Sequence, residues 1–409
     1  MFDALKHGPF LRILLGNFLL TLALMVQEVV LGYELYRITK DPLSLGLLGL
    51  AEAVPFMGLA LFGGHLADRR QRKYLMLLSL AGMLLGACVL AWIAPRLAAN
   101  GAQGAVLWAI YGNVAFVGLA RGIYSPAASS LRAQLVPNGL QANASAWSSA
   151  SWQSGMLIGP VAGGFAYVQM GLGSTLWLAV GLVVLSMLLV LSLPLLAAPK
   201  LASDAPDEDI WTSIRAGFSF VFANKILLYS ITLDLVAVLF GGVIAILPAF
   251  ALDVLHVGPQ ELGLLRTAPA VGAVLTMVLA ARFSPCVRAW RNMLIAVTGF
   301  GVCTLVFALS TSLWLSLAML ALTGVFDAIS VVIRQFLLQT VPPDHLRGRV
   351  LSVNGLFVSA SNEIGAFESG VAAKYLGLRT SVLAGAGLTL LSALWLWRQG
   401  RRYKLFSSG

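Results

Sequence analysis

Several long stretches of this sequence carry no charged side chain. The clearest are residues 74–93, 172–198, 292–326 and 380–397. A helix crosses the roughly 30 Å apolar core of a bilayer with about 20 apolar residues, and it satisfies its own backbone groups there. Because these stretches lack the alternation typical of half-buried strands, they predict helices that span a membrane. The stretch 292–326 is long enough for two.

The composition agrees with a membrane as the main solvent. The 409 residues are 59% apolar and 11% charged, whereas soluble chains carry about 25% charged residues. The net charge of +10 could suggest nucleic-acid binding, but such proteins gather Lys and Arg on one face. Here the basic residues stand in short clusters between apolar runs. We therefore expect a lipid bilayer as partner and no nucleic acid.

The few cysteines and histidines show no ligand spacing. The three cysteines, Cys88, Cys286 and Cys303, form no CxxC motif, and the 4 histidines are equally isolated. We expect no disulfide framework, no metal site and no cofactor.

Polar breaks divide the chain into twelve apolar segments. Cytoplasmic loops of membrane proteins carry an excess of Lys and Arg. With the N-terminus inside, the inner loops and ends collect about twenty of the 27 basic residues. This asymmetry predicts that both termini are cytoplasmic. The chain would be a multi-pass protein of a bacterial-type inner membrane.

The longest polar stretch separates two similar halves. It is rich in acids, which are rare elsewhere, and we read residues 199–216 as a cytoplasmic linker. The pattern Gln-x-Val-Pro at 134–137 recurs at 339–342, and the pair Gly159 and Gly164 recurs as Gly365 and Gly370. The repeat predicts an all-α fold of two parallel six-helix halves, 1–198 and 217–409.

Ionisable residues inside the apolar segments mark the candidate path. Such groups are costly in a bilayer and tend to face an aqueous cavity or a partner. An alternative is that each is a satisfied structural contact. Glu363 and Glu368 lie 140° apart around a helix of 3.6 residues per turn, so one is expected to titrate and the other to serve structure or gating. We favour Glu363 for proton coupling, with Glu28 or Asp234 next. The full candidate set is Glu28, Arg121, Asp234, Asp327, Glu363 and Glu368.

The loop between the second and third segments carries glycines, an acid and a basic cluster. The residues that matter are Gly64, Asp68, Arg69 and Arg72. This pattern resembles the signature loop of the major facilitator superfamily, with Gln71 standing where the family has glycine. The resemblance implies a gate closed on the inner side by Asp68, Arg69 and Arg72.

The fifth segment places small residues four apart, which allows tight helix crossing, and its proline permits a bend. A packing seam is one interpretation. The pattern also resembles the motif of the family's proton-coupled antiporters, which implies export. The stretch 118–122 resembles the family's arginine motif, which is linked to proton coupling. Stretches 124–127 and 343–350 are similar to the enterobactin-exporter and macrolide-efflux branch. The motif residues are Gly155, Gly159, Pro160, Gly163 and Gly164.

The resemblance implies a monomeric transporter that exchanges an amphiphilic small molecule, such as a drug or siderophore, for protons by alternating access. A lysophospholipid flippase or a nutrient importer of the same fold is the alternative. A non-transporting receptor is less favoured because no long soluble domain is present. A membrane enzyme would need clustered nucleophiles, bases or metal ligands, which the sequence does not offer.

Overall fold

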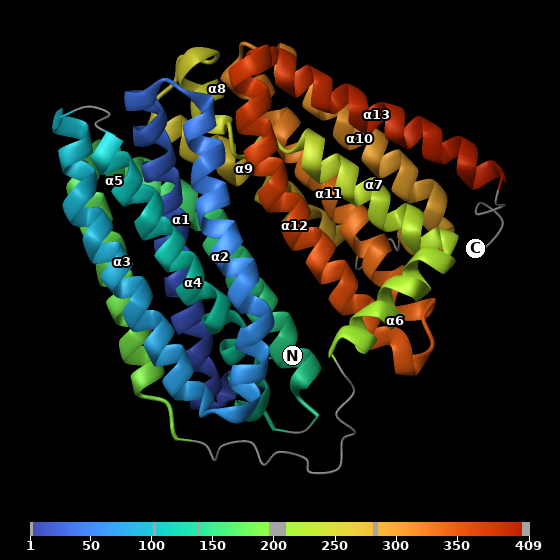
Figure 1. Cartoon of the computed structure of the whole chain (residues 1–409), viewed down its shortest axis with the longest axis horizontal. Coiled ribbons are helices and arrows are strands. Elements are labelled where there is room, and N and C mark those ends of the chain that lie inside the picture. The colour runs from blue at the N-terminus through green and yellow to red at the C-terminus, as the bar shows by residue number, and fades with distance from the viewer. Residues whose placement is uncertain (1–2, 101–103, 138, 196–209, 281–284, 403–409) are drawn as a thin grey trace. The chain divides into compact units, whose positions relative to one another are not determined.

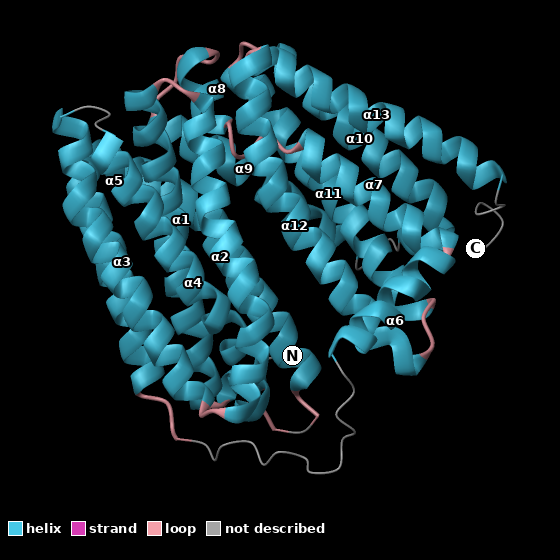
Figure 2. Cartoon of the chain, viewed as in Figure 1, coloured by secondary structure: helices cyan, strands magenta, loops and turns pink. Residues whose placement is uncertain are grey.

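A computed structural model describes residues 3–100, 104–137, 139–195, 210–280 and 285–402. Within helices it leaves out the side chains of 60–69, 97–100, 142, 210–214, 280, 344–345, 356 and 359–360. Throughout the described ranges the regular structure is helical (Figure 2). The predicted all-α class is therefore confirmed.

The first half of the chain forms five long helices, labelled in Figure 1. After a short 3-10 turn at Ala4–Lys6, they are α1 (Gly8–Thr39), α2 (Pro42–Arg69), α3 (Arg72–Asn100), α4 (Gly104–Leu135) and α5 (Gln141–Leu191). The helix α5 contains two predicted segments, because Gly171 interrupts it with φ 76, a backbone conformation that glycine adopts without steric cost.

The second half contains more breaks. Its helices are α6 (Ile210–Ala223), α7 (Lys225–Gly241), α8 (Leu247–Asp253), α9 (Pro259–Ala280), α10 (Ala289–Leu309), α11 (Leu313–Thr340), α12 (Asp344–Leu376) and α13 (Leu378–Arg402), with a 3-10 turn at Pro285–Arg288. The predicted seventh segment is split, since residues 242–246 between α7 and α8 are not helical.

In the described residues, 9 helices are long and apolar enough to cross a membrane, or up to 10 if the bent pair Arg215–Ala223 and Lys225–Gly241 forms one span. The chain is thus a multi-pass membrane protein. The count of twelve spans stays a prediction.

Two compact units make up the chain. Unit 1 comprises Met1–Ser203 with His256–Thr267, and unit 2 comprises Asp204–Leu255 with Ala268–Gly409. In unit 1, α1 packs on α5, α2 on α4, and α3 on both α4 and α5. In unit 2, α7 packs on α10, α12 and α13, and α10 packs on α11. The predicted bounds of the halves, 1–198 and 217–409, stay a prediction.

Each unit has its own apolar core. Phe10, Ile13, Met76 and Leu131 are fully or almost fully buried in unit 1, as are Trp290, Leu294, Ile333 and Val350 in unit 2. These cores position the polar side chains described next.

Candidate functional site

Among the ion pairs of the described residues, the one in which both partners are most buried lies in unit 2. Asp234 of α7 pairs with Arg334 of α11, and the two side chains are only 7% and 4% exposed. The Nε of Arg334 has no hydrogen-bond partner among the described atoms. The guanidinium therefore depends on one carboxylate for its compensation, and burial of such a charge is costly without it.

Asp327 lies on the same helix as Arg334, seven residues earlier. Residues two turns apart share one helix face, so both lie on one side of α11. The Asp327 side chain is partly buried, and no hydrogen bond or ion pair joins it to another described residue. It is thus an acid near, but separate from, the buried pair.

A more open ion pair connects distant parts of the sequence within unit 1. Arg266 of α9 pairs with Glu28 of α1, with the arginine 10% and the carboxylate 42% exposed. Arg266 belongs to the segment His256–Thr267 that clusters with unit 1. Glu28, named from the sequence, thus has a partner that sequence spacing could not indicate.

A third pair joins α2 and α4. Arg121 pairs with Glu52, the side chains being 37% and 28% exposed, and its guanidinium lies 5.7 Å from the centre of the Phe56 ring. Gly118, one turn before Arg121, makes this possible because a Cβ there would collide with the backbone of Glu52. Gly118 therefore lets α4 approach α2 closely at the level where Arg121 pairs with Glu52.

The glycines of α5 form a seam against α1. A Cβ built at Gly155 would lie 2.7 Å from the Thr21 side chain, and one at Gly163 would lie 3.1 Å from the Cα of Val26. Gly159 meets Met25 in the same way. Any larger residue would push the helices apart, so the predicted small-residue spacing does produce a close crossing.

The same stretch of α5 also receives the start of α9. A Cβ at Gly164 would collide with the carbonyl of Pro259, and one at Gly263 would collide with the carbonyl of Pro160. Thr267 Oγ1 donates a hydrogen bond of 2.9 Å to the carbonyl of Leu157. The five motif residues therefore serve two helix contacts, with α1 and with residues 259–267, beside the Glu28–Arg266 pair.

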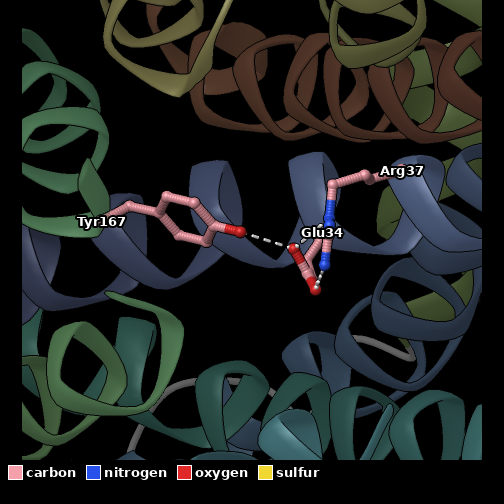
Figure 3. Close-up of polar contacts among 3 residues, drawn as sticks. All are labelled: Glu34, Arg37 and Tyr167. Atoms are coloured by element: carbon pink, nitrogen blue, oxygen red, sulfur yellow. Dashed lines mark hydrogen bonds and ion pairs between the residues drawn. The ribbon is translucent and has the colours of Figure 1, made fainter. Parts of the chain in front are cut away.

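A buried carboxylate that sequence reasoning missed lies on α1. Glu34 is 1% exposed and accepts hydrogen bonds from Arg37 Nε (3.0 Å), Arg37 Nη2 (2.6 Å) and the Tyr167 hydroxyl (2.7 Å) (Figure 3). The Tyr33 ring meets the Tyr167 ring edge-on at 5.6 Å. The signal that could have found it is the spacing of Glu34 and Arg37, one helical turn apart.

The basic residues at the start of α3 bind backbone carbonyls of α4 and of the end of α5. Arg72 Nη1 donates to the carbonyl of Ser130 at 3.3 Å, while Lys73 Nζ donates to the carbonyls of Leu191 and Leu193 at 2.9 and 2.5 Å. Cations at the C-terminal end of a helix such as α5 satisfy its last carbonyls and its dipole. The predicted gate residues Gly64, Asp68 and Arg69 lie outside the residues whose side chains are described.

The two acids of α12 occupy different surroundings. Both Glu363 and Glu368 are partly buried. Glu368 lines a small cavity against α7 and α13, and Glu363 is not among its lining residues.

The charged side chains inside the helices are the chemistry that this arrangement offers. Within the described residues, no group of three or more His, Cys, Asp or Glu side chains could hold a metal ion. Among the described residues, three ion pairs join different helices, and paired charges inside a membrane mark substrate or ion pathways and proton relays.

Comparison with known proteins decides the family. The model of the Major Facilitator Superfamily matches residues 13–258 and 235–408. The chain belongs to this superfamily. It is a transporter of small molecules, and not an enzyme.

Two relatives of this superfamily member span nearly its whole length. It is 27% identical to the enterobactin exporter EntS of Citrobacter koseri, over 97% of this chain and 94% of that protein. It is 26% identical to the multidrug efflux pump Tap of Mycolicibacterium fortuitum, over 93% of this chain and 92% of that protein.

Solved structures with the same fold have low sequence identity. A bacterial homolog of the human lysosomal transporter Spinster superposes with a TM-score of 0.74 at 17% identity, covering 97% of each chain. The nucleoside transporter NupG superposes with a TM-score of 0.71 at 14% identity, covering 95% of this chain and 98% of that one. These similarities establish the major facilitator fold.

Proposed function

We propose that this transporter is a secondary active exporter that exchanges amphiphilic small molecules, such as drugs or siderophores, for protons across a bacterial-type cytoplasmic membrane. The observation that carries the proposal is the double seam of α5, where Gly163 approaches α1 and Gly164 approaches residues 259–267. This stretch has the pattern of the family's proton-coupled antiporters. The names of the relatives EntS and Tap, an exporter and an efflux pump, support the direction.

Proton coupling would use the carboxylates inside the helices. A carboxylate in low dielectric is costly when ionised, and protonation removes that cost. Binding of a proton at one point of the cycle and its release at another can therefore drive a change of state. Glu363 is the first candidate, and the other members of the proposed path are Glu28, Arg121, Asp234, Asp327 and Glu368.

Alternating access would come from rocking of the halves 1–198 and 217–409 about a central site, joined by the linker 199–216, with both termini in the cytoplasm and the chain acting as a monomer. The gate on the inner side would be Gly64, Asp68, Arg69 and Arg72. The bonds of Arg72 and Lys73, at the start of α3, to carbonyls of α4 and of the end of α5 support a clamping role for this part of the motif.

The test is transport by inside-out membrane vesicles with a panel of drugs, siderophores and lysolipids. Under an imposed gradient that is acidic inside, we expect at least one compound to accumulate, and an uncoupler to abolish the accumulation. Glu363→Gln should abolish driven accumulation while binding of the compound persists. Normal driven transport by Glu363→Gln would move the coupling role to Glu28 or Asp234.

A matched glycine pair tests the α5 seam. Gly164→Ala adds a methyl group that collides with the Pro259 carbonyl, whereas the position of a Cβ at Gly181, on the same helix, meets nothing within 4 Å. We expect Gly164→Ala to reduce driven transport at least tenfold, and Gly181→Ala to match the wild type. Equal transport by both variants, or accumulation only in right-side-out vesicles, would contradict the proposed exporter.

A further inference from the structure

A small cavity lies where α7 ends in unit 2. α7 stops at Gly241, residues 242–246 are not helical, and α8 starts at Leu247. Gly242 and Ile246 line the cavity from this break, Glu368 and Ser369 line it from α12, and Ser381 lines it from α13. The cavity is small and has room for about one water molecule.

The polar side chains around the cavity present only hydrogen-bond acceptors to it. Ser369 Oγ donates its proton to the carbonyl of Gly242 at 3.0 Å, and Ser381 Oγ donates to the carbonyl of Leu378 at 2.9 Å. Each hydroxyl oxygen is left with lone pairs only, and a carboxylate such as Glu368 accepts when ionised. No Lys, Arg, His, Asn or Gln stands among the described lining residues.

The electrostatic surroundings of the cavity favour a bound cation. The C-terminal end of α7 contributes the negative pole of its helix dipole and carbonyls that lack a helical partner. The basic residues closest in sequence to the lining positions of α12 and α13 are Lys374 and Arg379, which are exposed and do not line the cavity. A partly buried carboxylate in these surroundings is costly when ionised unless a proton or a bound cation neutralises it.

The geometry points to a binding site for one small monovalent cation of the size of Na⁺. Its ligands would be the Glu368 carboxylate, the hydroxyl oxygens of Ser369 and Ser381, and backbone carbonyls at the 242–246 break. Hard cations take oxygen ligands of these types, and broken membrane helices supply the carbonyls. The site has a single carboxylate, and its other ligands are uncharged oxygens. It therefore differs from a metal site built from three or more His, Cys, Asp or Glu side chains. It goes beyond the proposed export and does not depend on it.

The test measures cation binding to the purified full-length protein in nanodiscs, at one pH and constant ionic strength. Radioactive ²²Na⁺ should bind saturably, and NaCl should raise the thermal midpoint followed by tryptophan fluorescence, whereas choline chloride should not. Glu368→Gln should abolish both effects, and Ser381→Ala should weaken the Na⁺ affinity about tenfold. The assay involves no substrate or proton gradient, so its failure is separate from a failure of the export proposal.

A matched control comes from the same helix. Ser392 of α13 donates to the carbonyl of Thr389, three residues earlier, at 2.7 Å. This is the same local bond that Ser381 makes, but Ser392 does not line the cavity. Ser392→Ala should keep wild-type Na⁺ affinity. If Glu368→Gln does not fold, the comparison of Ser381→Ala with Ser392→Ala still tests the proposed Na⁺ site. Absence of saturable ²²Na⁺ binding, or binding unchanged in Ser381→Ala or Glu368→Gln, would overturn the site.

Discussion

The ion pairs of the two units have the same chemistry in different surroundings. In unit 2, Asp234 and Arg334 are 7% and 4% exposed. In unit 1, Glu52 and Arg121 are 28% and 37% exposed. A buried charge that loses its partner has no solvent to replace it, whereas a more open charge does. The comparison predicts that removing one partner destabilises the protein more in unit 2 than in unit 1.

The largest expected effect comes from breaking the buried pair. Asp234→Ala leaves the Arg334 guanidinium buried without a counter-charge, so we expect the free energy of unfolding to fall by about 3–5 kcal/mol. Unfolding of the purified protein in mixed micelles measures this loss. The double variant Asp234→Leu with Arg334→Met should recover most of it. A single variant within about 1 kcal/mol of the wild type would remove the distinction between the units, since that is the range of open pairs.

Glu34, a buried carboxylate in unit 1, sharpens the comparison. It tests whether the loss of stability depends on burial or on which unit holds the residue. Tyr167→Phe removes the hydroxyl that donates to Glu34 at 2.7 Å. Hydrogen bonds to charged groups contribute about 1.5–3 kcal/mol, and we expect a loss of that size in the same unfolding measurement. Tyr375→Phe is the control, since Tyr375 is 78% exposed. Equal stability of the two variants would show that Glu34 is adequately compensated by Arg37 alone.

The smallest effect on stability is expected at the open pair. Glu52→Gln should change the free energy of unfolding by no more than about 1 kcal/mol, the range measured for exposed pairs. Proton-driven transport should nevertheless fall severalfold if the ion pair takes part in the transport cycle. We expect the same fall for Arg121→Gln. The vesicle assay and the unfolding measurement together separate the two effects. A loss of stability as large as that of Asp234→Ala would make the pair structural instead.

Short-range features of the fold could be predicted because they depend on nearby residues alone. The apolar runs predict the helices, and the break at Gly171 appears as a positive φ of 76 inside α5. The break at 242–246 was not predicted. It begins at the second residue of the pair Gly241–Gly242. The flanking sequence is as apolar as a continuous span, so no polar residues marked the break.

The all-helical membrane class and most of the ionisable residues inside the helices follow from the sequence alone, since apolar length and the cost of a charge in a bilayer need no partner to be recognised. The pairing of those residues comes from the three-dimensional packing. Arg121 and Glu52 are 69 residues apart, and Arg266 and Glu28 are 238 apart. Which acid meets which base depends on the rotation and neighbours of each helix, and glycines such as Gly118 control how closely those neighbours approach.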